Sequence, residues 1–188
     1  FITNFVSFLD NIMVGRLGTE EMSGVAIVGS MIFIFNLSVF GGFSGAGIFT
    51  AQYYGKGDHK SIAYTMRYKL YLGFILVAVS LAVFTVFDEE LISLFLNENG
   101  DDVGDITLTL SYAKEYIRIM LVGLLPFALT QMYSTTLRET GNTVMPMKAS
   151  VAAVVTNLVF NYILIFGHFG APKMGVRGAA WATVLSRF

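Results

Sequence analysis

Polar residues inside apolar stretches are the residues of this 188-residue chain best suited to chemistry. Asp10 is the only acidic residue in the stretch 1–14, and Asn157 and Asn161 lie four positions apart in another stretch. On a helix this spacing puts both amides on one face, about 6 Å apart along the axis. A carboxylate with neutral oxygen ligands can hold a hard cation such as Na⁺, and burial would favour its protonated form.

Each of these polar groups also has a structural interpretation. Asp10 lies shortly before Gly15 and a polar connection, so it could lie at a membrane interface. Asn157 and Asn161 could form hydrogen bonds to a neighbouring helix. The residues alone leave both interpretations open.

Other polar and aromatic side chains in the apolar stretches could line a pocket for organic cations. These residues are Asn36, Phe127, Thr130, Gln131 and Tyr133. The alternative is that the polar ones join helices and the aromatic ones contact lipid.

The residue sets typical of enzymes are absent from the sequence. The chain has no Cys and only two His, so thiolate and clustered-histidine metal sites are excluded. It contains no zinc-protease spacing, Walker loop or nucleophile elbow. Its net charge of −1 provides no basic field for nucleic acid. We therefore expect no enzyme activity, no cofactor, no nucleic-acid partner and no bound metal other than a Na⁺ held by Asp10, Asn157 and Asn161.

The apolar stretches themselves are long enough to cross a bilayer. Hydrophobic residues make up 55% of the chain and charged residues 13%, and the mean hydropathy is +0.66. Four runs contain no Asp, Glu, Lys or Arg: 22–55, 70–87, 119–137 and 149–172. Each is near or above the roughly 18–20 residues that a membrane helix needs. A soluble protein of this size could not enclose four such helices.

This pattern predicts an all-α membrane protein, a six-helix transmembrane bundle whose first and last helices are truncated. The expected spans are 1–14, 24–53, 61–87, 106–137, 147–169 and 178–188. Pro126 lies within the fourth span and is expected to bend it. The acidic segment 88–105 is either the end of the third span or a short helix at the interface.

The distribution of basic residues predicts the orientation of the bundle. Lys56 and Lys60 follow the second span, and Arg138 and Lys148 flank the connection after the fourth. Cytoplasmic loops carry an excess of Lys and Arg. We therefore expect loops 55–60 and 138–147 to be cytoplasmic in a multi-pass plasma-membrane protein.

Five segments resemble the multidrug and toxic compound extrusion (MATE) transporter family, in the family's order and spacing. They are 10–18, 51–58, 137–146, 157–167 and 175–183. The resemblance covers nearly the whole chain. It implies that residues 1–188 are the N-terminal lobe of a twelve-helix transporter, whose partners are the lipid bilayer and a C-terminal lobe.

The family resemblance also implies a function. Members export organic cations and related compounds in exchange for Na⁺ or H⁺, by alternating access. The residues that match the family's cation site are Asp10, Asn157 and Asn161, and Thr183 is a further match. Some members have an aspartate where this chain has Asn161, so the site here would combine one carboxylate with neutral partners.

Two other functions fit parts of the sequence. A lipid-linked oligosaccharide flippase of the related superfamily should have a more cationic cavity, and no Lys or Arg is expected deep in these spans, which favours a drug exporter. A non-transporting membrane scaffold would use its polar residues only to join helices.

Overall fold

The computed structural model describes residues 12–98, 106–170 and 172–188. Every regular element in these ranges is a helix. The helices are α2 (Thr19–Gly55), α3 (His59–Val86), α4 (Asp88–Glu98), α5 (Ile106–Val122), α6 (Leu124–Glu139), α7 (Val144–Phe166), a 3-10 turn at His168–Gly170, and α8 (Val176–Leu185). Asp10 and most of the predicted first span lie outside the described residues.

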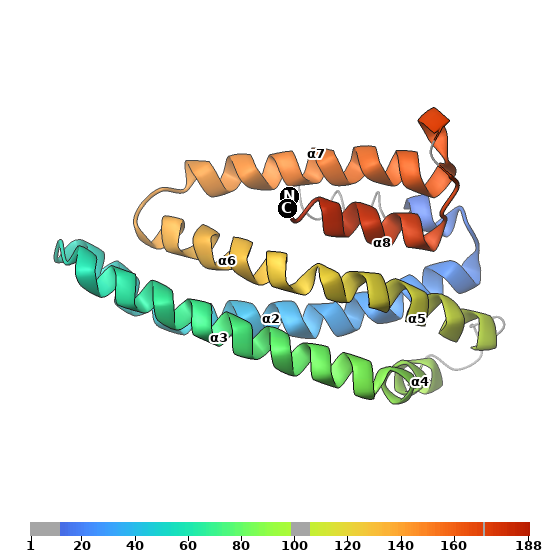
Figure 1. Cartoon of the computed structure of the whole chain (residues 1–188), viewed down its shortest axis with the longest axis horizontal. Helices are drawn as coiled ribbons and strands as arrows, with labels where there is room; N and C mark the ends of the chain where they lie inside the picture. Colours follow the sequence, from blue (N-terminus) through green and yellow to red (C-terminus); the bar gives the residue numbers. More distant parts are fainter. Residues whose placement is uncertain (1–11, 99–105, 171) are drawn as a thin grey trace.

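The long helices run up and down beside one another (Figure 1). The α2–α3 and α6–α7 connections lie at one end of the bundle, on the left of Figure 1, and α4 and the α7–α8 connection lie at the other. Helix α2 packs against α3, α5 and α6, while α8 packs against α5 and α7. The core therefore centres on α2, with α8 bridging α5 to α7.

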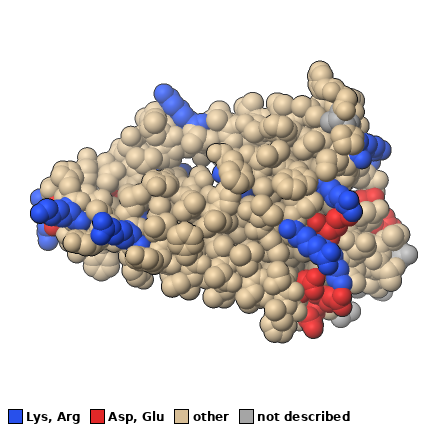
Figure 2. All heavy atoms as spheres, in the orientation of Figure 1, with Lys and Arg blue, Asp and Glu red and all other residues tan. Residues whose placement is uncertain are grey.

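The outer surface of the bundle suits a bilayer. Helices α2, α3 and α7 are long and apolar enough to cross a membrane, and α5 with α6 would make a fourth span if counted as one bent unit. Large apolar side chains such as Tyr71 and Ile75 are exposed. Figure 2 shows charged side chains gathered toward the two ends, with a broad uncharged surface between them. The chain is an integral membrane protein.

The predicted fourth span, 106–137, is not one continuous helix. It breaks at Gly123 into α5 and α6, which we call the bent span, and the two halves meet at 49°. Pro126 lies in the first turn of α6, where its missing N–H cannot bond the carbonyl of Val122, four residues back. Gly123 N–H donates instead to the carbonyl of Met120, at 2.9 Å, so the chain tightens locally before α6 begins.

The other predicted boundaries also shift. The fifth helix begins at Val144 and ends at Phe166, whereas the expected span was 147–169. Gly167 ends this helix because it adopts a left-handed conformation, with φ of 75°. Of the two interpretations of the acidic segment after α3, the structure has the short helix: α4 begins at Asp88, separated from α3 by Phe87.

The loop between α2 and α3 is short because Asp58 begins the next helix at once. One Asp58 carboxylate oxygen accepts from Ser61 N–H at 3.1 Å, and the other accepts from the Ser61 hydroxyl at 2.6 Å. These two bonds favour the charged form and lower the pKa of the Asp58 carboxyl. The polar loop is thereby confined to the end of the bundle.

A glycine sets how closely α8 approaches α7. A Cβ atom on Gly178 would lie 2.6 Å from the carbonyl carbon and oxygen of Leu164. Small residues allow such close helix contacts in membranes. This contact fixes α8 beside α7, and so brings polar residues of the two helices together.

We predict that Gly178→Ala destabilises the protein by about 1–3 kcal/mol, because the added methyl group must push the backbones of α7 and α8 apart. The measurement is thermal unfolding of an intact transporter carrying this chain, in detergent. Gly41→Ala is the matched control, since Gly41 is an exposed helical glycine with nothing within 4 Å of a new Cβ. Equal melting temperatures for the two variants would contradict the role of Gly178.

Candidate functional site

Asn157, Asn161 and Thr183 form a polar cluster between α7 and α8. The Asn161 amide nitrogen donates to the Asn157 side-chain oxygen at 3.1 Å, along one face of α7. The Asn157 amide nitrogen donates to the Thr183 hydroxyl at 3.4 Å, from α7 to α8. Both asparagines are buried, with 6% and 1% of their surface exposed. The four-residue spacing on α7 and the close approach at Gly178 together bring these three side chains within reach of one another.

A cavity of about 480 Å³ opens beside this cluster. Its described lining comes from α2, α5, α7, α8 and Val14, and comprises Val14, Val25, Ala26, Gly29, Ser30, Phe33, Tyr116, Asn161, Ala179 and Thr183. Its volume falls within the roughly 300–1,000 Å³ of small-molecule pockets. The lining is mostly apolar, with a few polar groups, so the cavity can hold an organic molecule next to Asn161 and Thr183.

The donor set of the cluster suits a hard monovalent cation. Asn157, Asn161 and Thr183 present amide and hydroxyl oxygens, which are neutral. In the described part of the chain, no group of three or more His, Cys, Asp or Glu residues could hold a metal ion. A carboxylate for this site would have to come from Asp10, which lies outside the described residues.

The structure separates the other expected pocket residues. Phe127 and Thr130 lie just after the break in the bent span, and the Phe127 ring contacts that of Phe35, with centroids 6.0 Å apart. Tyr133 is exposed, and Asn36 and Gln131 are partly buried. None of these five expected residues is among the described lining of the 480 Å³ cavity.

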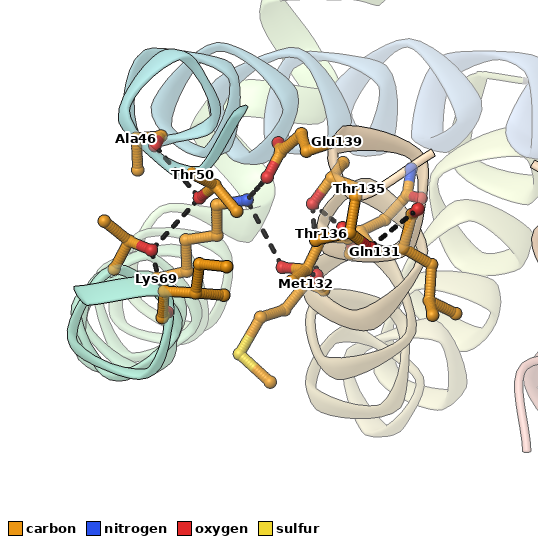
Figure 3. A network of polar contacts seen from close by, with 12 residues as sticks. Ala46, Thr50, Lys69, Gln131, Met132, Thr135, Thr136 and Glu139 are labelled. Atoms are coloured by element: carbon orange, nitrogen blue, oxygen red, sulfur yellow. Dashed lines mark hydrogen bonds and ion pairs between the residues drawn. The ribbon is translucent and has the colours of Figure 1, made fainter. Parts of the chain in front are cut away.

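Lys69 is a buried charged residue whose role was not predicted. Its side chain is 0% exposed, and its ammonium lies 2.5 Å from the Glu139 carboxylate and 3.3 Å from the Thr136 hydroxyl (Figure 3). It lies within the expected span 61–87. The ion pair joins α3 to α6. It also touches α2, because a Cβ on Gly47 would collide with the Glu139 carboxylate.

Lys69 is thus a buried Lys within an expected span, next to the last residue of α6, Glu139. Burial of Lys69 is possible because Glu139 and Thr136 satisfy its charge and its donors. The charge lies away from the 480 Å³ cavity, whose described lining includes no Lys or Arg. The cavity itself therefore remains uncharged in the described part of the chain.

We predict that Lys69→Met destabilises the protein by about 3 kcal/mol, near the low end of the usual cost of breaking a buried pair, because Glu139 is 16% exposed. The double variant Lys69→Met/Glu139→Gln should recover most of the loss, since it leaves no unpaired buried charge. Thermal unfolding of the intact transporter measures both.

Arg177→Met provides the matched control for this pair. Arg177 pairs with Glu115, but its side chain is 59% exposed. Exposed pairs contribute about 0–1 kcal/mol. The double variant at Lys69 and Glu139 could instead lose as much unfolding free energy as its two single variants lose together. The ion pair would then not be the stabilising contact.

Comparison with known proteins agrees with this architecture. The sequence profile of the MatE family matches residues 1–163. The chain is 32% identical over 179 residues to a probable multidrug resistance protein NorM of Thermotoga maritima, covering 95% of this chain and 37% of that protein. It is 29% identical over 182 residues to a protein of Shewanella oneidensis named FAD transporter, covering 96% of this chain and 38% of that protein.

A crystal structure of a MATE protein in complex with MaD3S has the same fold. The TM-score is 0.77 at 24% sequence identity, and the match covers 99% of this chain and 39% of the other. The chain thus spans less than two fifths of the length of the proteins it matches. It belongs to the MatE family, whose members are transporters and not enzymes, and it corresponds to their N-terminal lobe.

Proposed function

We propose that this chain forms the N-terminal lobe of an antiporter that exports organic cations and related small molecules in exchange for Na⁺ or H⁺. The observation that carries this proposal is the position of Asn161 and Thr183, which belong to the buried polar cluster and also line the 480 Å³ cavity. A cation bound at the cluster and a molecule in the cavity would therefore lie next to each other.

In the proposed mechanism, the cation binds between the carboxylate of Asp10 and the oxygens of Asn157, Asn161 and Thr183. One carboxylate with neutral partners balances a single positive charge. The cation and the exported molecule each favour one of two lobe arrangements. Exchange follows because a ligand shifts such an equilibrium only by its difference in affinity for the two states.

The cavity supports an aromatic or cationic substrate. Phe33 and Tyr116 contribute aromatic surface to it, and its described lining includes no Lys or Arg that would repel a cation. The names of the relatives indicate different substrates: one is a probable multidrug resistance protein, and another is an FAD transporter. The two are similarly identical to this chain. Organic cations and FAD should therefore be compared directly as substrates.

The proposed location is the plasma membrane, with loops 55–60 and 138–147 in the cytoplasm. These two loops lie at the same end of the bundle, on the left of Figure 1. At the other end, Lys114 pairs with Glu89 and Arg177 pairs with Glu115. The loops at that end also carry Arg16 and Lys173. The excess of basic residues at the end proposed to be cytoplasmic is therefore small, and it has the sign that this orientation requires.

The two alternatives make different demands on the cavity. A flippase for lipid-linked oligosaccharides needs cations to hold its phosphate groups, and the described cavity lining supplies none. A scaffold needs no cavity beside its polar cluster.

We predict that Asp10→Asn abolishes cation-driven efflux of ethidium by the intact transporter. The change removes the only charge of the proposed site while keeping a similar shape. Efflux from vesicles is measured under a Na⁺ gradient and, separately, under a pH gradient. The gradient that drives wild-type efflux identifies the coupling ion.

Tyr133→Phe is the control, because Tyr133 is exposed and lies outside the cavity. It should retain wild-type efflux. If Asp10→Asn also transported at the wild-type rate, the proposed cation site would be wrong. If the wild-type protein moved neither ethidium nor FAD, the scaffold would be the better interpretation.

A further inference from the structure

We infer that Arg187 is the positioning residue that couples the cation site to the break in the bent span. The inference rests on the proposed function and adds a route between the two sites. It starts from a charged side chain, just after α8, that neither the cation site nor the cavity includes.

The Arg187 side chain lies against the break itself. Its Nη1 donates to the carbonyl of Gly123 at 3.2 Å, and its guanidinium carbon is 5.0 Å from the centroid of the Phe127 ring. The Thr130 hydroxyl donates to the Arg187 carbonyl at 3.4 Å. Arg187 therefore contacts the break residue and two residues of the α6 half.

Arg187 has no carboxylate partner among the described residues, where the ion pairs are Lys69–Glu139, Lys114–Glu89 and Arg177–Glu115. A cation in an apolar environment needs such compensation. Here a carbonyl and an aromatic face provide it, which is weaker than a carboxylate would be. The guanidinium can therefore leave the Gly123 carbonyl and the Phe127 ring at a smaller cost in free energy than it could leave a carboxylate.

Arg187 is also connected to the cation site. Thr183 lies four residues earlier in the chain. The Ser186 hydroxyl donates to the Thr183 carbonyl at 2.8 Å, and Arg187 N–H donates to the carbonyl of Val184 at 3.0 Å, so the turn that carries Arg187 is bonded to the end of α8. The Thr183 hydroxyl accepts the hydrogen bond from Asn157. A Cβ on Gly123 would lie 3.0 Å from Val184, so the break packs directly on α8. A shift of α8 at Thr183 is therefore transmitted to Gly123.

Charge gives this connection a direction. A cation bound beside Thr183 would add a positive charge to the same end of α8 that precedes Arg187, and like charges repel more strongly in an apolar interior than in water. Cation binding then weakens the contacts of Arg187 with Gly123 and Phe127. Helix α8 also contributes Ala179 and Thr183 to the lining of the 480 Å³ cavity. Because Arg187 sets how the end of α8 lies against the break, the cation and a substrate in the cavity oppose each other through α8 and Arg187.

The test is the effect of the cation on substrate binding in the intact transporter, with Arg187→Met as the main variant. Ethidium affinity is measured by fluorescence at zero and saturating Na⁺, and as a function of pH without Na⁺. In the wild type, we expect the coupling cation to weaken ethidium binding by a factor within about 5–150, the usual range of coupling between sites. In Arg187→Met this factor should fall below about 2, while both ligands still bind.

Two further variants make the test specific. Arg177→Met removes an exposed arginine from the start of α8 and should keep the wild-type factor. Arg187→Lys keeps the charge but cannot both bond the Gly123 carbonyl and stack on Phe127 in the same way, so its factor should fall at least about 2-fold. If Arg187→Met does not fold, Arg187→Lys decides the question.

Suppose that the coupling cation weakens ethidium binding in Arg187→Met by the same factor as in the wild type, or does so in Arg187→Lys if Arg187→Met does not fold. The role of Arg187 would then be wrong, and the proposed antiport would be unaffected. The role of Arg187 would also be wrong if a variant had a lower melting temperature and bound both ligands more weakly, while the cation still weakened ethidium binding by the wild-type factor. Such a result would show a purely structural effect. If the wild-type protein itself shows no effect of Na⁺ or pH on ethidium binding, the proposed antiport fails, and this inference fails with it.

Discussion

The absence of water in the hydrocarbon core is the constraint on which this structure depends. Every backbone N–H and C=O there must find a partner inside the protein, and a helix does this within its own segment. Helices α2, α3 and α7 meet the constraint by being long and apolar. The bent span cannot meet it alone, because Pro126 has no N–H to donate. At the break, Gly123 N–H donates to the carbonyl of Met120, and the Gly123 carbonyl accepts from both Phe127 N–H and the Arg187 guanidinium.

Buried charges follow the same constraint in two different ways. Lys69 has a carboxylate at 2.5 Å and a hydroxyl at 3.3 Å, so its pairing is strong and specific. Arg187 has only a carbonyl and an aromatic ring. A paired charge fixes two helices, whereas a charge held by neutral groups can move at a smaller cost. The first contact is therefore suited to a rigid part of the lobe, and the second to a part that changes.

The sequence could predict features that depend on neighbours along the chain. The charge-free runs follow from local composition, and the shared face of Asn157 and Asn161 follows from their spacing. The burial of Lys69 could not be predicted because its partner Glu139 is 70 positions away, and no local pattern connects them. The exact break in the bent span could not be predicted either. Proline disturbs the helix over the preceding turn, and the packing of Val184 against Gly123 decides where it opens.

These contacts divide the lobe around Gly123. On one side, α6 is joined to α3 by Lys69 and Glu139 and packs on α2, so this half of the bent span is anchored. On the other side, α5 packs on α2 and α8, and α8 carries Thr183 of the polar cluster. A rearrangement that starts at the cluster reaches α8 first and then the break. Movement should therefore concentrate where α8 meets Gly123. At that point α6, which is anchored to α3, meets α5, which packs on α8 and its cation-site residue Thr183.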